Sequence, residues 1–195
     1  CSAGSRLYVQ SGIYEQLMPA LEAAAKAIKV GPGLDPLTEM GPMVSAAQRR
    51  TVEEYVESGV AEGAELIAGG AAIDAEGFYV APTIFANVNP SMRIVREEIF
   101  GPVLSVQRFE DEAEAVALAN DTPFGLASSI YSTNTNRIQR LIPAIQAGTV
   151  WVNCHNIFDA ALPFGGYKES GLGREMGEEV MAMYSEVKSV CMAVS

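Results

Sequence analysis

The sequence predicts an α/β fold, built as an open, twisted, mostly parallel sheet flanked by helices. The 195-residue chain is 49% hydrophobic and 19% charged, so it is long and apolar enough to bury one substantial core. From residue 103 onward, strand and helix patterns alternate in the order strand, helix, strand, helix, strand. Parallel strands need such crossover helices, and right-handed crossovers place the helices over the faces of the sheet.

The first elements have clear local signals. Alternating apolar residues at 7–10 indicate a strand. Ser11 is expected to cap a helix over residues 11–28, in which Pro19 predicts a kink or a later start. The apolar face of this helix is expected to consist of Ile13, Leu17, Leu21, Ala24 and Ile28.

Two loops and a second helix come next. Proline and glycine predict loops at residues 30–36 and 39–42. Ser45 and Gln48 have the spacing of a capping box at a helix start. The apolar stripe of that helix is Val52, Tyr55, Val56 and Val60. Short strands are then predicted at residues 65–68, 78–80 and 83–85.

The second half contains the alternation itself. Strands are predicted at residues 103–109, 126–131 and 149–153, with helices at 111–120 and 134–146 between them. A glycine-rich segment at 163–177, a short helix at 178–184 and a final strand at 187–194 complete the chain. The sequence shows no linker long enough to mark a second full domain.

Charge and hydropathy exclude several function classes. The chain carries 24 acidic and 13 basic side chains, a formal net charge of −11. Nucleic acids and anionic membranes are bound by clustered Lys and Arg side chains. Because this chain has a large excess of acidic side chains, neither is expected as a partner. No apolar stretch approaches the ~18 residues of a membrane-spanning helix, and no signal-peptide pattern opens the chain. These features predict a soluble, cytoplasmic protein.

The cysteines argue for a reducing compartment and against a zinc site. Cys1, Cys154 and Cys191 are an odd set at wide spacings, and His155 is the single histidine of the sequence. Cys154 and Cys191 lie in apolar settings and are expected to be small core residues. No metal site is therefore predicted.

Cys1 has a different setting. It lies among Ser, Ala and Gly residues that leave room around the sulfur, and Arg6 can favour the thiolate. The chain opens at Cys1 without an initiator Met and runs at once into a strand. We expect this end to be a cut in a longer polypeptide or the product of processing that exposes Cys1. The alternative is a terminal residue with no role.

Two further segments are candidate ligand sites. Glu97 and Glu98 point about 100° apart if they begin a helical turn, so one can face a cleft, and Phe100 can offer a flat apolar wall. Carboxylates bind ribose hydroxyls well, although an exposed acidic pair beside a core Phe is the plainer alternative. Residues 155–158 and 163–168 follow the last strand of the alternation, where α/β sheets bind ligands.

Four motifs of the sequence, taken in order, resemble motifs of the aldehyde dehydrogenase superfamily. The resemblance covers essentially the whole chain and is to the C-terminal half of the family's proteins. The four motifs are Cys1–Arg6, Gly41–Val44, Glu97–Pro102 and Pro163–Gly171, which resemble the nucleophilic cysteine segment, a turn, the cofactor-contact motif and a late glycine motif. The resemblance implies a catalytic domain over residues 1–185 and an oligomerisation strand over residues 186–195. It also implies a homodimer or homotetramer.

The resemblance implies NAD- or NADP-dependent oxidation of an aldehyde to a carboxylic acid. Cys1, as thiolate, would attack the carbonyl to form a thiohemiacetal, and the thioester left after hydride transfer would be hydrolysed. Glu98 would bind the nicotinamide-side ribose, Phe100 would pack near the nicotinamide, and Gln48 would approach the cofactor. Glu175 matches a glutamate proposed to assist proton relay.

The same resemblance implies a substrate tunnel. Its lining would be His155, Asn156, Ile157, Phe158 and Phe164. The two phenylalanines suit an apolar or aromatic aldehyde, and Asn156 indicates a neutral tunnel.

The resemblance also places the cofactor domain, the general-base glutamate and the oxyanion-hole asparagine before the cysteine. These 195 residues alone are therefore expected to be inactive. Two alternatives stay open. One is an N-terminal cysteine hydrolase, which needs stacked antiparallel sheets and uses the α-amine of Cys1 as base. The other is a non-catalytic assembly module on the same scaffold.

Overall fold

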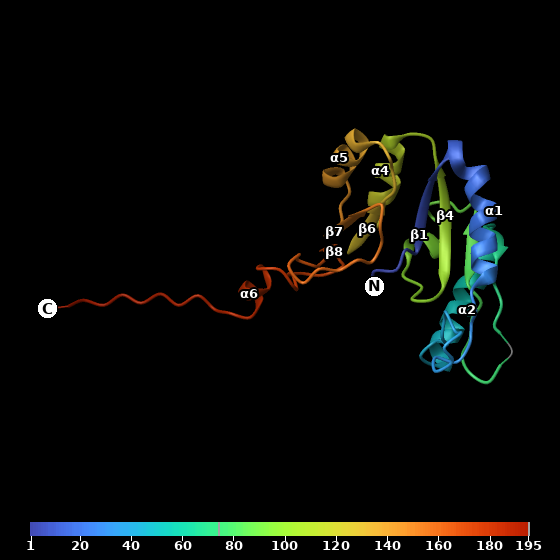
Figure 1. Ribbon diagram of the computed structural model, residues 1–195, viewed down its shortest axis with the longest axis horizontal. Helices are drawn as coiled ribbons and strands as arrows, with labels where there is room; N and C mark the ends of the chain where they lie inside the picture. Colours follow the sequence, from blue (N-terminus) through green and yellow to red (C-terminus); the bar gives the residue numbers. More distant parts are fainter. Residues whose placement is uncertain (74, 195) are drawn as a thin grey trace. The chain divides into compact units, whose positions relative to one another are not determined.

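The computed structural model describes residues 1–73 and 75–194 and has an α/β fold (Figure 1). Its contacts divide the chain into two compact units. The first unit comprises Cys1 and Ala3–Asp121, and the second comprises Ser2 and the chain from Thr122 onward. Among the described residues, no helix combines the length and the apolarity needed to cross a membrane.

The first unit contains a four-stranded mixed sheet and four helices. Its elements are β1 (Arg6–Gln10), α1 (Ser11–Ala27), α2 (Ala46–Ala61), β2 (Glu65–Ala68), β3 (Thr83–Ala86), α3 (Arg93–Arg96), β4 (Val103–Phe109) and α4 (Glu112–Asn120). The strand order is β1-β4-β3-β2, in which β4 pairs in parallel with both β1 and β3. β2 joins the edge of the sheet antiparallel to β3. The predicted α/β fold is therefore confirmed, with a mixed sheet flanked by helices.

The two faces of this sheet bury two separate apolar clusters. On β3, Phe85 packs with residues of α2 and α3, whereas its neighbours Ile84 and Ala86 pack with α1. Successive strand residues point to opposite faces, so α1 covers one face of the sheet and α2 with α3 covers the other. Figure 1 shows α1 running alongside the sheet.

The second unit is built from short strands. Its elements are β5 (Phe124–Gly125), β6 (Ala127–Ile130), α5 (Thr135–Ala144), β7 (Thr149–Val152), β8 (Tyr167–Lys168) and α6 (Val180–Met183). β6 and β7 form a parallel pair around α5, as the alternation predicts. β5 and β8 form an antiparallel pair. β4 belongs to a different sheet, so the alternation after residue 103 spans more than one sheet.

Helix α1 differs from the prediction in its cap, at Pro19 and in its buried face. Gln10 occupies the N-cap position without a side-chain bond, and the Ser11 hydroxyl instead donates to the carbonyl oxygen of Phe109 at 3.0 Å. Pro19 lies inside the helix and is exposed, and the helix begins at Ser11, so the later start that Pro19 allowed is not observed. The buried face is turned from the predicted one. It consists of Tyr14, Leu17, Met18, Leu21 and Ala25, while Ile13 and Ile28 are exposed.

The second helix follows its predicted signals closely. The Ser45 hydroxyl accepts the backbone N–H of Gln48 at 3.1 Å, which confirms the cap. Val52, Tyr55 and Val56 are buried, whereas Val60 is exposed near the end of the helix.

One predicted strand is wrong, and a second is not formed within this single chain. Residues 78–80 form no strand, and only an isolated bridge joins Val80 to Ala72. Residues 187–194 contain no strand either, and Val187, Val190 and Val194 are exposed. A strand needs a neighbour for its backbone hydrogen bonds, and within the described residues this segment has none. The same lack of packing leaves Cys191 exposed, contrary to the core position predicted for it, while Cys154 is partly buried.

The core of the first unit predicts a graded response to phenylalanine truncation. Phe85 is 0% exposed and Phe78 is 40% exposed. Phe85→Ala should lower the free energy of unfolding by about 3–5 kcal/mol, because it leaves a cavity between the sheet and its helices. Urea unfolding followed by circular dichroism measures this change. Phe78→Ala is the matched control and should cost far less, so equal losses would contradict this description of the core.

Candidate active site

Glu97 is held in place by two side chains of its own unit. The Tyr55 hydroxyl donates to its carboxylate at 2.7 Å, and Arg93 Nε donates to the same oxygen at 3.0 Å. The Arg93 guanidinium also lies 4.4 Å from the centre of the Tyr55 ring. The hydrogen bond from Tyr55, together with Arg93, lowers the pKa of Glu97 below its ordinary value. One carboxylate oxygen of Glu97 is thus taken by contacts within its own unit.

Glu98 has the opposite role. Its side chain is exposed and makes no hydrogen bond or ion pair with the described residues. The expectation that the two glutamates begin a helical turn is wrong, because Glu97 caps the end of α3 with an extended backbone, φ −104° and ψ 157°. The two side chains nevertheless differ, since Glu97 bonds to Tyr55 and Glu98 stays free of such bonds among the described residues. A free carboxylate has two acceptor oxygens available for a ligand that donates hydroxyl hydrogen bonds, such as a ribose.

Phe100 lies in a strained backbone conformation. Its φ is +54°, in the left-handed region that a bulky residue avoids at a cost of order 1–3 kcal/mol. The Gln48 amide nitrogen donates to the carbonyl oxygens of Ile99 at 3.2 Å and Phe100 at 3.0 Å. The Phe100 ring is 62% exposed, so this turn presents a flat apolar surface beside Glu98.

Gly101 lets the turn approach α2. A Cβ at this position would lie 2.4 Å from a methyl carbon of Val52, closer than real Cβ atoms come. Val52 is fully buried and cannot withdraw into open space. A glycine is therefore required after Phe100.

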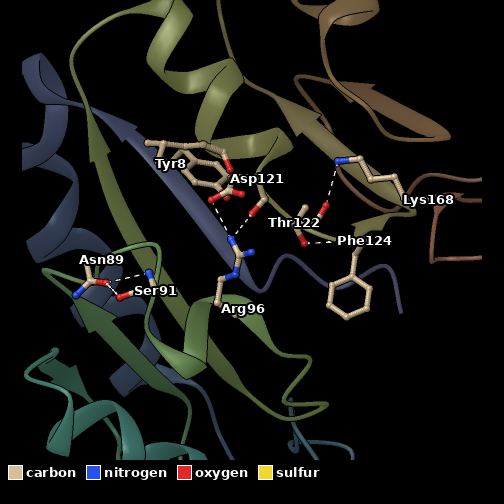
Figure 2. Close-up of polar contacts among 9 residues, drawn as sticks. Tyr8, Asn89, Ser91, Arg96, Asp121, Thr122, Phe124 and Lys168 are labelled. Carbon is tan, nitrogen blue, oxygen red and sulfur yellow. Dashed lines mark hydrogen bonds and ion pairs between the residues drawn. The ribbon is translucent and has the colours of Figure 1, made fainter.

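Arg96, the last residue of α3, anchors the start of the Glu97–Phe100 turn, as Figure 2 shows. Its Nη1 atom donates to the backbone carbonyl of Asp121 at 3.2 Å and to the Asp121 carboxylate at 2.9 Å. The Tyr8 hydroxyl donates to the carbonyl oxygen of Leu118 at 3.0 Å, which ties β1 to α4. Burial raises the pKa of Tyr8, so its hydroxyl stays a donor at neutral pH. These bonds therefore hold the end of α3, where the Glu97–Phe100 turn begins, in a fixed position.

The second unit gathers four aromatic rings. Trp151 makes edge contacts with His155 at 5.2 Å and with Phe158 at 5.6 Å between ring centres. Phe158 makes a similar contact with Phe164 at 5.1 Å. The Trp151 indole N–H donates to the carbonyl oxygen of Ile157 at 2.7 Å, which fixes the loop that carries these side chains. We did not predict Trp151 as part of the site, although it is the sole tryptophan and lies within the last predicted parallel strand.

The polar residues of this loop have defined partners. His155 Nδ1 and the Ser129 hydroxyl lie 2.8 Å apart. The Ser2 hydroxyl donates to the side-chain oxygen of Asn156 at 2.7 Å, and Asn156 has a φ of +58°. Asn tolerates this conformation better than most residues, which favours an amide at this turn.

Glu175 is tied to Phe164 through the backbone. Phe164 N–H donates to the Glu175 carbonyl at 2.7 Å, and Glu175 N–H donates back at 2.8 Å. The Glu175 side chain is exposed, and Phe164 is partly buried. The structure therefore joins the predicted relay residue to one predicted tunnel residue.

The predicted residues thus form two groups. In the first unit, Gln48 on α2 bonds to the turn that carries Glu98 and Phe100. The exposed Cys1 is assigned to the same unit. The predicted tunnel residues and Glu175 lie in the second unit. In residues 1–73 and 75–194, His, Cys, Asp and Glu side chains form no group of three that could hold a metal ion. A free carboxylate beside an exposed ring fits a nucleotide cofactor with a ribose and a planar base.

The model of the aldehyde dehydrogenase family matches residues 1–190. The chain belongs to this family. It is 46% identical over 193 residues to a betaine aldehyde dehydrogenase of Rhizobium leguminosarum, covering 97% of this chain and 40% of that protein. It is 45% identical over 194 residues to retinal dehydrogenase 2 of Homo sapiens, covering 100% of this chain and 38% of that protein. The chain therefore spans about 40% of the length of these relatives.

Solved structures of the family have the same fold. An NAD⁺ complex of the aldehyde dehydrogenase from Bacillus cereus matches with a TM-score of 0.97 at 44% identity, covering 100% of this chain and 40% of that one. A betaine aldehyde dehydrogenase from Staphylococcus aureus in complex with NAD⁺ matches with a TM-score of 0.91 at 44% identity, covering 94% and 37%. These relatives hold NAD⁺.

The Tyr55–Glu97 pair predicts a pH-dependent contribution to stability. Because the folded pKa of Glu97 lies below its ordinary value of 4.5, the pair stabilises the fold above that pH. The contribution is lost as the pH falls through the lowered pKa. Tyr55→Phe should therefore lower the urea midpoint most at neutral pH, and the difference from the parent chain should shrink between about pH 5 and pH 3.

The matched control is Tyr184→Phe, which removes the same hydroxyl from an exposed ring. It should leave the midpoint and its pH dependence unchanged. A Tyr55→Phe variant whose midpoint ran parallel to that of the parent chain over the whole range would contradict the assigned cause of the pKa shift.

Proposed function

We propose that the protein containing this chain oxidises an aldehyde to a carboxylic acid, with Cys1 as nucleophile and NAD as the hydride acceptor. The observation that carries the proposal is the Glu97–Phe100 turn, which leaves the Glu98 carboxylate unpaired and the Phe100 ring exposed. It occurs in a chain of the aldehyde dehydrogenase family. Membership of the family and the NAD⁺ complexes of its relatives support it. In the balanced reaction, aldehyde, NAD⁺ and water give carboxylic acid, NADH and a proton.

Cys1 supplies the covalent step. Its thiolate attacks the aldehyde carbonyl and forms a thiohemiacetal, whose hydride leaves when the carbonyl re-forms as a thioester. NAD, when bound, takes up this hydride. Water then hydrolyses the thioester and frees the thiol. The exposed side chain of Cys1 fits this role, and a structure of a G234S mutant of the S. aureus relative contains a BME-modified cysteine.

The cofactor-facing roles follow from the turn. Glu98 accepts hydrogen bonds from the ribose next to the nicotinamide, because both of its oxygens are free. Phe100 packs its exposed ring near the nicotinamide. The relatives' complexes favour NAD over NADP. Most of the remaining binding surface belongs to a cofactor domain outside these 195 residues, since the chain spans about 40% of its relatives' length.

The aromatic loop holds the aldehyde. Phe158 and Phe164 offer apolar ring faces, while His155, Asn156 and Ile157 complete the lining of a neutral tunnel. We therefore propose an apolar or aromatic aldehyde as substrate. Named substrates of the relatives include betaine aldehyde and retinal, which differ widely in polarity. Glu175 assists proton relay from its position beside Phe164.

The order of motifs supports a place in the C-terminal part of the complete enzyme. We propose that residues 1–185 form its catalytic domain and that residues 186–195 pair with a neighbouring subunit in a homodimer or homotetramer. The exposed valines of this tail, described above, suit such pairing. Three free cysteines suit a reducing compartment, in agreement with a cytoplasmic location.

Two alternative functions have less support. An N-terminal cysteine hydrolase needs stacked antiparallel sheets, whereas β1, β3 and β4 pair in parallel, as do β6 and β7. A non-catalytic assembly module would not need an unpaired Glu98 beside an exposed Phe100.

The nucleophile is tested by Cys1→Ser in the complete enzyme. Aldehyde oxidation should fall at least about 10³-fold, because a serine hydroxyl is far less acidic and less nucleophilic than a cysteine thiol. Binding of NAD, measured by fluorescence, should stay within about twofold of the parent. Cys191→Ser is the matched control and should retain full activity. Retention of activity by Cys1→Ser would reject Cys1 as the nucleophile.

The dependence on the rest of the enzyme is tested with the 195-residue chain itself. Mixed with NAD and a panel of aldehydes, the chain should produce no NADH above background at 340 nm, because the general base and the oxyanion donor are absent. The complete enzyme assayed alongside is the positive control. NADH formation by the chain at the rate of the complete enzyme would contradict the proposal.

A further inference from the structure

The carboxyl ends of β1, β3 and β4 meet at one edge of the four-stranded sheet, because these strands run in parallel. β1 and β4 are neighbours, yet the chain leaves them for opposite faces of the sheet. Val9 of β1 packs with α1, whereas the hydroxyl of Tyr8, on the other face, bonds to Leu118 of α4. Open α/β sheets bind ligands at such a switch point, outside the carboxyl ends of the strands. The Glu97–Gly101 segment precedes β4 and therefore lies at the opposite edge.

A hollow of about 370 Å³ opens beside the end of β4, a volume in the range of small-molecule sites. β3 pairs with β4 only as far as Phe85 opposite Ser105, and Asn87 then turns the chain away with a φ of +51°. The loop after β3, the end of β4, and helices α1 and α4 line the hollow, all within the first unit. We call it the β4 hollow and define it by Tyr14, Val88, Asn89, Gln107, Arg108 and Leu118.

Gln107 is a buried polar residue of this lining. It is 5% exposed, and its side chain makes no hydrogen bond with the described residues. Its neighbour across the sheet is Tyr8, which donates its hydroxyl hydrogen to Leu118 instead. A buried amide without a partner costs about 1–3 kcal/mol. Gln107 therefore offers an acceptor oxygen and two N–H donors to an occupant of the hollow.

Tyr14 and Asn89 add hydrogen-bond donors. The Tyr14 hydroxyl makes no hydrogen bond with the described residues. Burial, together with the carboxylates of Glu65 and Glu15, raises the pKa of Tyr14, so this hydroxyl keeps its proton at neutral pH. The side-chain oxygen of Asn89 accepts from the backbone N–H of Ser91 at 2.9 Å and from its hydroxyl at 2.6 Å (Figure 2). This leaves the amide nitrogen of Asn89 to donate to a ligand.

The charges around the hollow disfavour an anionic ligand. Among the described residues that line it, Arg108 is the one basic side chain. Arg108 is paired with Glu15 at 3.3 Å, and Glu110 lies 3.8 Å from the same guanidinium. Glu114 contributes another carboxylate to the lining. Carboxylates therefore outnumber the guanidinium, and a phosphate or carboxylate ligand would meet net repulsion.

We propose that the β4 hollow is a second ligand site, which binds a neutral, planar heterocycle with a lactam edge, as in a pyrimidine nucleoside. A lactam presents an N–H donor next to a carbonyl acceptor, and the primary amide of Gln107 pairs with that edge through two hydrogen bonds. Val88 and Leu118 contact the apolar faces of the ring. Tyr14 and Asn89 donate to the remaining oxygens of the ligand. The site goes beyond the proposed function, because NAD is assigned to the opposite edge of the sheet.

Uridine tests the site in the complete enzyme saturated with NAD. N3-methyluridine is the matched control ligand, because its methyl group replaces the lactam N–H. Titration calorimetry should give a dissociation constant for uridine about tenfold lower than that for N3-methyluridine, as expected for one paired amide. Uridine 5′-monophosphate should bind more weakly than uridine, because its phosphate meets the carboxylates. Absence of uridine binding, or equal binding of uridine and N3-methyluridine, would overturn the proposal and leave water as the partner of Gln107.

Gln107→Leu removes the amide and leaves an apolar side chain in its place. In this variant the two ligands should bind within about twofold of each other, because the pairing group is gone. Gln16→Leu is the matched control, since Gln16 is exposed on α1 and makes no side-chain hydrogen bond with the described residues. It should keep the tenfold preference for uridine. The same preference in Gln107→Leu would show that the lactam pairs elsewhere and would overturn the proposal.

A second measurement uses the parent enzyme and does not depend on how a variant folds. Amide hydrogen exchange should slow in peptides spanning residues 86–92 and 104–111 when uridine binds, because the ligand holds the loop after β3 against the end of β4. A peptide spanning residues 97–103 should be unaffected. Slower exchange only at residues 97–103 would place uridine at the surface assigned to NAD and overturn the proposal, as would no change in any of the three peptides.

Discussion

The left-handed turn at Phe100 is the constraint on which the rest of the candidate site depends. It costs strain, which the surrounding contacts must outweigh, and it leaves a bulky ring exposed next to an unpaired carboxylate. Neither feature helps the chain to fold. Both are useful if the turn is a binding surface, because a ligand then meets groups that are already oriented and loses less entropy on binding.

Residues far from Phe100 in the sequence maintain this turn, because the packing of the first unit brings them next to it. α2 and α3 pack on one face of the sheet, and Gly59 permits their close approach, because a Cβ there would lie 3.0 Å from both Ile94 and Phe85. This packing places Tyr55 against Glu97 and Gln48 against the turn. The core and the candidate cofactor surface are therefore coupled, and core substitutions along α2 will also disturb the turn.

The sequence points to candidate residues more readily than to their geometry. Residue types and motif order made Glu98, Phe100 and the aromatic loop candidates, because those signals are local. The two carbonyl bonds of Gln48 join residues 48 and 100, and the ring contacts of Trp151 form only when the loop folds back, so local patterns could not predict them. The tail at 187–194 has strand-forming residues but no strand partner among the described residues, and periodicity alone could not show that lack.

The central claim is that the turn is formed before the cofactor binds. Crystal structures of the complete enzyme with and without NAD test it most directly. We expect the same positive φ at Phe100 and the same two Gln48 bonds in both structures, with the Glu98 carboxylate within hydrogen-bond distance of a ribose hydroxyl when NAD is bound. A cofactor-free structure with a negative φ at Phe100 and a displaced Gln48 would contradict it.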